Sequence, residues 1–122
     1  MTGPVLLVED DPAITLIVET VLKAAGYDVH AARHAQEALD FTTRTTPVLL
    51  ISDLNLPGGA NGATLATTLR ATLPSLPVVL ISGEFGENAF LPDAPPGTAY
   101  LAKPFRRASL TEAIAHARDY AP

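Results

Sequence analysis

The stretch Val48-Leu49-Leu50-Ile51-Ser52-Asp53 decides how the rest of this sequence folds. Its apolar residues occupy consecutive positions, which is typical of a strand buried on both faces of a parallel sheet. Such a strand needs helices on both sides, so the sequence predicts an α/β fold. The run ends in a single carboxylate, Asp53, at the point where the chain leaves the core.

Three other short apolar runs also end in polar residues. They are 5–8 before Glu9-Asp10-Asp11, 78–81 before Ser82, and 99–102 before Lys103-Pro104. The carboxyl ends of strands in an open parallel sheet meet at one edge, where such folds bind ligands. We therefore expect three carboxylates (Glu9, Asp10 and Asp53), a hydroxyl and an ammonium around one cleft.

Helical patterns alternate with these runs along the chain. The expected strands lie near 4–9, 28–32, 48–52, 78–81 and 98–102; the expected helices run from Pro12 to just before Gly26, over 35–45, from 61 or 62 to 73, and over 107–120. Asp11 and Pro12 form a typical helix start. Between the fourth and fifth strands, Gly83, Gly86 and several prolines leave room for at most two helical turns, around 84–91.

The composition limits the possible classes of protein. The 122 residues, 48% hydrophobic and 17% charged, indicate one domain with a real core. The net charge of -5 and the lack of a basic face argue against direct nucleic-acid binding. Without cysteine there is no disulfide or thiolate chemistry. No apolar stretch has membrane-spanning length and no signal peptide is evident, so we expect no membrane partner and a cytoplasmic location.

Three carboxylates in one cleft repel one another and need a counter-charge. Mg²⁺ suits such a site, because it prefers oxygen ligands and usually takes one or two carboxylates from protein. The backbone carbonyl of Asn55, two residues after Asp53, can add a further ligand. Such a site favours phosphoryl transfer to a carboxylate, since an aspartyl-phosphate is a known covalent intermediate. Lys103 and Ser82 would then contact phosphoryl oxygens.

The sequence resembles the response-regulator receiver domain of two-component signalling over nearly the whole chain. The matching elements are Glu9-Asp10, Asp53, Ser82 and Tyr100-x-x-Lys103-Pro104-Phe105, in this order and spacing. The resemblance implies a flavodoxin-like (βα)₅ doubly wound parallel sheet with strand order 2-1-3-4-5, here with a short or eroded fourth helix. It implies one receiver domain over residues 1–122 without an output domain, either acting alone or cut from a larger protein.

The resemblance further implies that Asp53 is the phosphoacceptor of a phosphorelay. The phosphoryl group would come from a phosphohistidine of a sensor kinase or of a histidine phosphotransfer protein. Asp10, Asp53 and the carbonyl of Asn55 would hold Mg²⁺, and Glu9 would bind it mainly through water. The domain would act as a switch that is phosphorylated and dephosphorylated, and not as a turnover enzyme.

The same resemblance assigns the residues on the other side of the cleft. Lys103 would contact the phosphate, and the peptide bond before Pro104 would be cis. Ser82 and Tyr100 would form the switch pair. A phosphoryl group would draw the Ser82 hydroxyl toward Asp53, and Tyr100 could then rotate into the vacated space. The face around the last strand and last helix would change shape for a downstream partner.

Some positions depart from the commonest receivers or vary among them. The Pro57-Gly58-Gly59 loop is one residue longer than usual and resembles the variant found in receivers of hybrid sensor kinases and in some stand-alone receivers. In the family, the residues two past the acceptor and two past the Ser/Thr flank the path of attacking water. These are Asn55 and Glu84 here, so we expect moderate to fast loss of the phosphoryl group.

Two other functions remain open from the sequence. The first is a pseudo-receiver, which would use the same fold as a protein-interaction module without phosphorylation. The second is a phosphohydrolase acting on small phosphate esters through Asp53. Haloacid-dehalogenase-type enzymes place a general acid two residues after the nucleophile, and Asn55 at that position cannot serve as one.

Overall fold

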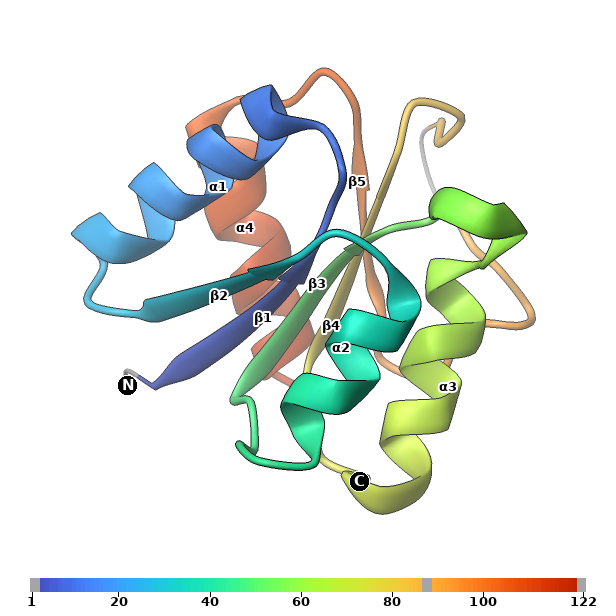
Figure 1. The fold of residues 1–122 in the computed structure, drawn as a ribbon. Helices are drawn as coiled ribbons and strands as arrows, with labels where there is room; N and C mark the ends of the chain where they lie inside the picture. Colours follow the sequence, from blue (N-terminus) through green and yellow to red (C-terminus); the bar gives the residue numbers. More distant parts are fainter. Residues whose placement is uncertain (1–2, 87–88, 121–122) are drawn as a thin grey trace.

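Five parallel strands form one sheet at the centre of the computed structural model, which describes residues 3–86 and 89–120 (Figure 1). The strands are β1 (Pro4–Val8), β2 (Asp28–Ala32), β3 (Leu49–Asp53), β4 (Val78–Ser82) and β5 (Ala99–Ala102). The helices are α1 (Pro12–Ala24), α2 (Ala35–Thr42), the 3₁₀ turn η1 (Pro57–Gly59), α3 (Gly62–Thr72) and α4 (Arg107–Arg118). The order β2-β1-β3-β4-β5 confirms the predicted topology.

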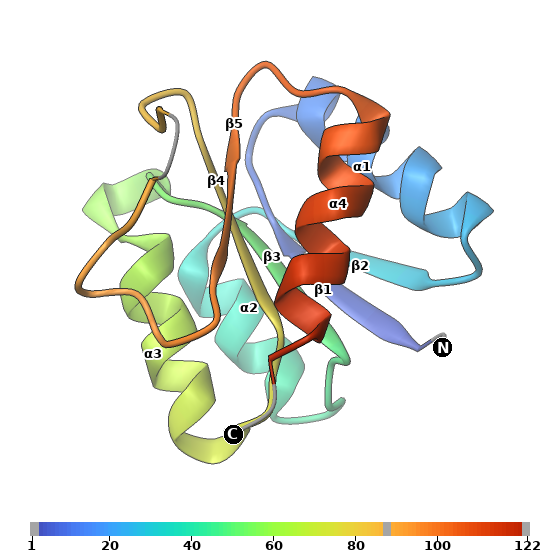
Figure 2. The same cartoon turned by 180° about the vertical axis from the view of Figure 1, so that it is seen from behind.

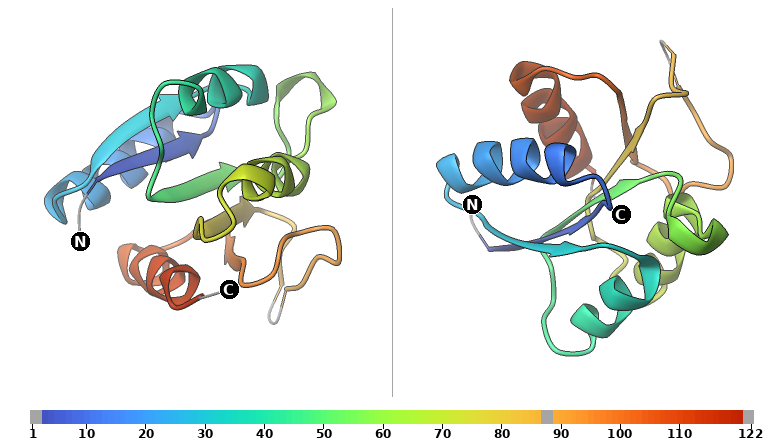
Figure 3. Two further views of the ribbon diagram at one scale, coloured as in Figure 1. Left: turned by 90° about the horizontal axis from the view of Figure 1, so that it is seen from below. Right: turned by 45° about the horizontal axis from the view of Figure 1, so that its top comes forward.

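The helices cover the sheet in two layers (Figure 3). α1 and α4 pack on one face, where Val18, Leu22 and Leu110 belong to one hydrophobic cluster. α2 and α3 pack on the other face, where Phe41 and Leu69 belong to a second cluster. β3 lies between the two clusters and is buried at every position, and its first three residues belong to the apolar run that predicted a buried strand.

Side-chain caps fix where α1 and α3 begin. The Asp11 carboxylate accepts from the N–H of Ala13, and Pro12 occupies the first turn of α1. Asn61 accepts from the N–H groups of Ala63 and Thr64 at the start of α3. Such caps pair helix-end N–H groups that have no intrahelical partner. Both helices therefore start beside the edge of the sheet where Asp53 lies.

Several boundaries differ from the sequence-based expectation. β3 runs one residue further, so Asp53 is the last residue of the strand and not the first of the loop. α2 ends at Thr42, and α4 ends at Arg118. Both are shorter than predicted, because helical periodicity alone does not mark the end of a helix. Among the described helices, none combines the length and the apolar character needed to cross a membrane.

The segment 83–98, called here the β4–β5 connection, has no helix among its described residues. The expectation of at most two helical turns around 84–91 is consistent with this: residues 84–86 and 89–91 contain none, and 87–88 lie outside the described residues. The glycines at its start and Pro92 restrict helix formation from both sides. The connection instead runs beside α3 as an irregular chain, drawn in gold and orange in Figure 2.

Candidate functional site

The predicted site residues gather at the carboxyl edge of the sheet. Val8 pairs with Ser52, and Asp53 pairs with Ile81, so the chain leaves β1, β3 and β4 at nearly the same level. Glu9 and Asp53 are 2% and 9% exposed, whereas Asp10 is exposed to solvent. The strands thus bring together residues that lie far apart in sequence.

Lys103 joins two of these carboxylates. Its Nζ donates to Oδ2 of Asp53 at 3.2 Å and lies 3.3 Å from Oε1 of Glu9. The peptide bond between Lys103 and Pro104 is cis. The ammonium is partly buried, so its attraction to both carboxylates is less screened than at a free surface.

The pKa values of Glu9 and Lys103 are shifted by burial and by the neighbouring charges. Burial raises the pKa of the Glu9 carboxyl above its usual value, and the charge of Asp53 acts in the same direction. The backbone N–H of Asp11 and the Lys103 ammonium oppose this shift but do not cancel it. Burial tends to lower the pKa of Lys103, but the attraction of Glu9 and Asp53 holds that pKa above its usual value. Lys103 therefore stays charged at neutral pH.

The three carboxylates carry more negative charge than Lys103 neutralises, which suits a divalent cation. Carboxylate oxygens of Glu9, Asp10 and Asp53 lie within 4.8 Å of one another. Oε1 of Glu9 is buried and accepts no hydrogen bond from the described residues, although Lys103 lies close to it. Three oxygen ligands, one of them without a hydrogen bond from the described residues, match the ligand preference of Mg²⁺. Glu9, Asp10 and Asp53 are thus the residues in the described part of the chain that would hold this ion.

A glycine that the sequence analysis did not single out supports the strand carrying Asp53. The N–H of Gly62 donates to the Leu54 carbonyl at 2.7 Å. A Cβ at position 62 would lie 2.3 Å from the carbonyl oxygen of Asp53 and 2.9 Å from Oγ of Ser52. α3 therefore starts in direct contact with the backbone of Asp53. The clue in the sequence is a glycine at the first position of a capped helix.

Ser82, Glu84 and Asn55 form a chain of hydrogen bonds at the mouth of the site. Oγ of Ser82, a residue that is 1% exposed, accepts from the backbone N–H of Glu84 at 3.0 Å. The side-chain amide of Asn55 donates to the Glu84 carboxylate at 3.1 Å. The two positions expected to flank the path of water are thus bonded to each other. Because separate loops supply the two residues, this bond could not be predicted from the sequence.

Tyr100 lies on β5, with its side chain on the face covered by α2 and α3. Its hydroxyl accepts from the backbone N–H of Leu91 at 3.1 Å. The Phe85 ring meets the Tyr100 ring edge-on, with centroids 5.3 Å apart. Both partners belong to the β4–β5 connection. Sequence reasoning missed them because an irregular chain has no periodicity from which its contacts can be predicted.

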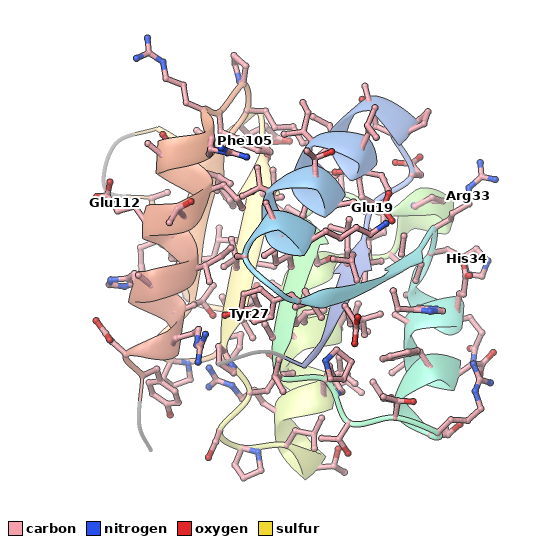
Figure 4. All side chains as sticks on the ribbon, turned by 90° about the vertical axis from the view of Figure 1, so that its left-hand side faces the viewer. Glu19, Tyr27, Arg33, His34, Phe105 and Glu112 are labelled. Atoms are coloured by element: carbon pink, nitrogen blue, oxygen red, sulfur yellow. The ribbon has the colours of Figure 1, made fainter. Side chains whose placement is uncertain are left out.

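On the opposite face of the sheet from Tyr100, side chains packed beneath α1 and α4 stabilise the fold. Tyr27 is buried and its hydroxyl accepts from Arg118, whereas Phe105 packs against the same core at the start of α4 (Figure 4). Arg33 and His34 lie at the end of β2 (Figure 4), and together with Asp10 they line a shallow hollow of about 420 Å³.

Comparison with known proteins identifies the family. The chain matches the response regulator receiver domain family over residues 5–115. The response regulator protein FleR of Pseudomonas aeruginosa is 35% identical over 124 residues, which cover 100% of this chain and 26% of FleR. A putative response regulator from Chloroflexus aurantiacus superposes with a TM-score of 0.84 at 30% identity, covering 98% of this chain and 100% of that one.

The receiver domain of the hybrid histidine kinase CckA superposes with a TM-score of 0.77 at 33% identity, covering 95% of this chain and 99% of that one. The protein described here therefore belongs to the response regulator receiver domain family. Members of this family bind Mg²⁺ at an acidic pocket and interact with histidine kinases or phosphotransfer proteins. The chain spans about a quarter of the length of FleR.

Proposed function

We propose that this receiver accepts a phosphoryl group on Asp53 from the phosphohistidine of a sensor kinase or phosphotransfer protein. The observation that carries this proposal is the position of Asp53 between Lys103, at 3.2 Å, and two further carboxylates at the sheet edge. In the transfer, an Asp53 carboxylate oxygen forms a bond to phosphorus and the phosphorus–nitrogen bond of the donor breaks. The electron pair of that bond stays on the histidine nitrogen.

Each residue at the site has a defined task in this proposal. Glu9, Asp10 and Asp53, with the Asn55 carbonyl, would hold Mg²⁺, and Glu9 would act mainly through water. When bound, the ion neutralises charge on the phosphoryl group. Lys103 would bind a phosphoryl oxygen. Because Lys103 already contacts Asp53, the phosphoryl group would meet a positive charge without a large movement of the chain.

We further propose that Ser82 and Tyr100 report the phosphorylated state, and that Asn55 and Glu84 set its lifetime. The hydrogen bond between Asn55 and Glu84 supports the second role, because it places an amide and a carboxylate together beside the acceptor. Such groups can position a water molecule for attack on phosphorus. The domain would act as a switch and not as a turnover enzyme, with the downstream partner recognising the face around β5.

Intact-mass spectrometry tests the main proposal. Incubation with acetyl phosphate and Mg²⁺ should add about 80 Da, the mass of one phosphoryl group, and both EDTA and the Asp53→Asn substitution should abolish the gain. Ser75→Asn, on the turn before β4, serves as a matched surface control that keeps the gain. No gain in the unmodified protein would favour the pseudo-receiver function, and a gain that survives in Asp53→Asn would exclude Asp53 as the acceptor.

A further inference from the structure

β5 is an edge strand of the sheet, because β4 is its only neighbour. Directly after β5, the N–H of Lys103 donates to the Ser82 carbonyl at 3.0 Å. Successive residues of a strand direct their backbone groups alternately to its two sides, so the N–H and C=O groups of Tyr100 and Ala102 point away from β4. No group of the described residues bonds to them there. They form the kind of unpaired row to which another strand can add.

A groove of about 850 Å³, called here the β5 groove, follows this free edge. Residues 98–102 lie along its length, and Phe85 lines it on the side of the β4–β5 connection. On the other side, α4 contributes a stripe at helical spacing: Ser109, Glu112, Ala113 and His116. In Figure 2, β5 correspondingly runs between α4 and the β4–β5 connection. The groove therefore gives access to the unpaired backbone groups of the strand.

Two charged residues of opposite sign line the β5 groove. Arg106 directly precedes α4, and Glu112 lies in the middle of that helix. Both are exposed, and neither forms an ion pair with another described residue. Six helix positions span about 9 Å, close to the roughly 7 Å between alternate residues of a strand. A strand with an acidic and a basic side chain two positions apart would therefore place each beside an opposite charge.

We propose that the β5 groove binds an extended peptide segment of a partner protein, which adds a sixth strand to the sheet beside β5. The backbone of the segment pairs with Tyr100 and Ala102. Its basic side chain lies against Glu112 and its acidic side chain against Arg106, while apolar side chains at the alternate positions face Phe85. This inference goes beyond the proposed phosphoacceptor function and requires no phosphorylation.

The groove suits an extended segment better than it suits a helix. A helix bonds its own backbone groups internally, so it would leave those of Tyr100 and Ala102 unpaired. Strand addition pairs them, and it is a mode of peptide recognition in which main-chain bonds give affinity and side chains give specificity.

A second copy of this chain complements the groove poorly. Its own β5, Ala99–Ala102, has no charged side chain that could pair with Arg106 or Glu112. Its other edge strand, β2, offers Asp28, but the residue two positions further, His30, stacks on Phe41 of the same chain. The unpaired charges of the groove therefore favour a different protein as the partner.

The first experiment titrates the unmodified, unphosphorylated protein with an acetylated and amidated peptide, in which valines alternate with a central lysine and two flanking aspartates. The peptide reads the same in both directions, so it can pair with β5 in either. At saturation it should shift the NMR signals of the Tyr100 and Ala102 amides and slow their hydrogen exchange about two- to tenfold, the range for one neutral hydrogen bond. Amides of β2 are the internal control. Unshifted signals at Tyr100 and Ala102 would overturn the proposal.

Two N-methylated forms of the peptide test the backbone pairing. One is methylated on the valine nitrogens and the other on the lysine and aspartate nitrogens, so each lacks the N–H groups on one side of the strand. Only one side can face β5. One form should therefore keep the affinity of the parent peptide, and the other should bind at least about fivefold more weakly, because each lost hydrogen bond costs about two- to tenfold. Equal affinities of the two forms would overturn strand addition.

Variants of the protein test where the peptide binds. Ser109→Trp fills the groove from α4 and should abolish the shifts at Tyr100 and Ala102, whereas Thr111→Trp, exposed on α4 but outside the groove, should keep them. Equal binding by these two variants would overturn the proposal. Self-association of the unmodified protein in sedimentation that Ser109→Trp prevents would replace the partner segment with a second copy and would also overturn it.

A charge exchange tests the role of Glu112. Glu112→Arg should weaken binding of the peptide about two- to fivefold, the range for an exposed ion pair. A peptide with glutamate in place of the central lysine should bind Glu112→Arg more tightly than it binds the unmodified protein. Failure of this exchange would show that Glu112 does not contact the segment and would overturn its assigned position.

Discussion

The ammonium of Lys103 lies 3.2 Å from Oδ2 of Asp53, although fifty positions separate the two residues in the sequence. The same nitrogen lies 3.3 Å from Oε1 of Glu9. One cation thus compensates two carboxylates that are both largely buried. This arrangement makes Lys103 important for the fold as well as for the proposed chemistry, and the two roles can be measured separately.

Replacing Lys103 with methionine should lower the stability of the protein at neutral pH. The substitution keeps most of the side-chain volume but leaves the charges of Glu9 and Asp53 without their counter-charge. Removing one partner of a buried ion pair costs about 3–5 kcal/mol, and the partial exposure of Lys103 reduces the expected loss to about 1–2 kcal/mol. Urea unfolding in EDTA measures the difference.

The same substitution should slow phosphorylation by acetyl phosphate at least about tenfold, because a charge that would bind a phosphoryl oxygen is lost. Lys23→Met, in the last turn of α1, is the matched control and should change neither stability nor rate appreciably. Equal rates for Lys103→Met and Lys23→Met would show that Lys103 does not contact the phosphoryl group.

Replacing Glu9 with glutamine should stabilise the protein in EDTA at neutral pH but not in acid. The pKa of Glu9 is raised in the folded state by burial and by the charge of Asp53. A carboxyl with a raised pKa favours the folded state while it is protonated. Its contribution to the free energy of unfolding is therefore fully present below the ordinary pKa of 4.5 and is lost as pH rises through the raised value. Glutamine does not ionise and so avoids that loss.

Urea unfolding measures this difference when Glu9→Gln and the unmodified protein are compared at several pH values. The series starts at about pH 4, where carboxyl groups ordinarily titrate. The free energies of unfolding should converge at the acidic end and separate toward neutral pH. Glu112→Gln, on the exposed side of α4, provides the control for loss of a surface carboxylate. A constant difference at all pH values would contradict a raised pKa for Glu9.

Replacing Gly62 with alanine should destabilise the protein, although alanine is the better helix former. The helical preference of alanine over glycine amounts to about 1 kcal/mol. The new Cβ would lie 2.3 Å from the backbone oxygen of Asp53, so either β3 or the start of α3 must shift. Overpacking of this kind costs about 1–3 kcal/mol. The nearest atom is a backbone oxygen, which cannot rotate away, so we expect the clash to outweigh the helical preference.

The free energy of unfolding and the rate of phosphorylation should therefore both fall in Gly62→Ala. Gly83→Ala is the matched control for stability, because no heavy atom lies within 4 Å of the added Cβ. Equal stability of the two variants would show that the contact between α3 and Asp53 relaxes without cost.

Changing Asn55 or Glu84 to arginine should prolong the lifetime of the phosphorylated state. Either substitution breaks the hydrogen bond between the two side chains and places a long cation where water would approach the phosphoryl group. We expect the half-life to increase several-fold, measured as the decay of the phosphorylated mass after acetyl phosphate is removed. Glu19→Arg, on α1, controls for the change in net charge. Unchanged half-lives in both Asn55→Arg and Glu84→Arg would contradict this role.

Much of the site could be predicted from the sequence because the information is local. The unbroken apolar run before Asp53 predicts a buried parallel strand, and the polar groups after the other runs then fall at one edge by topology alone. The cap at Asp11 predicts a helix start for the same local reason. The strand order and the meeting of Glu9, Asp10 and Asp53 follow from these features and from the family resemblance.

Only the tertiary structure decided what holds the β4–β5 connection and what lies around the cleft. The bonds from Leu91 to Tyr100 and from Asn55 to Glu84 join separate segments, and one of them involves a backbone N–H that any residue could supply. The need for glycine at position 62 likewise depends on how closely α3 approaches β3. The sequence by itself determined the elements, their order and the chemistry of the site, because these depend on residue type and on short-range periodicity. The paths of irregular segments and the pairing of their polar groups depend on packing between distant parts of the chain, which has no periodic signature.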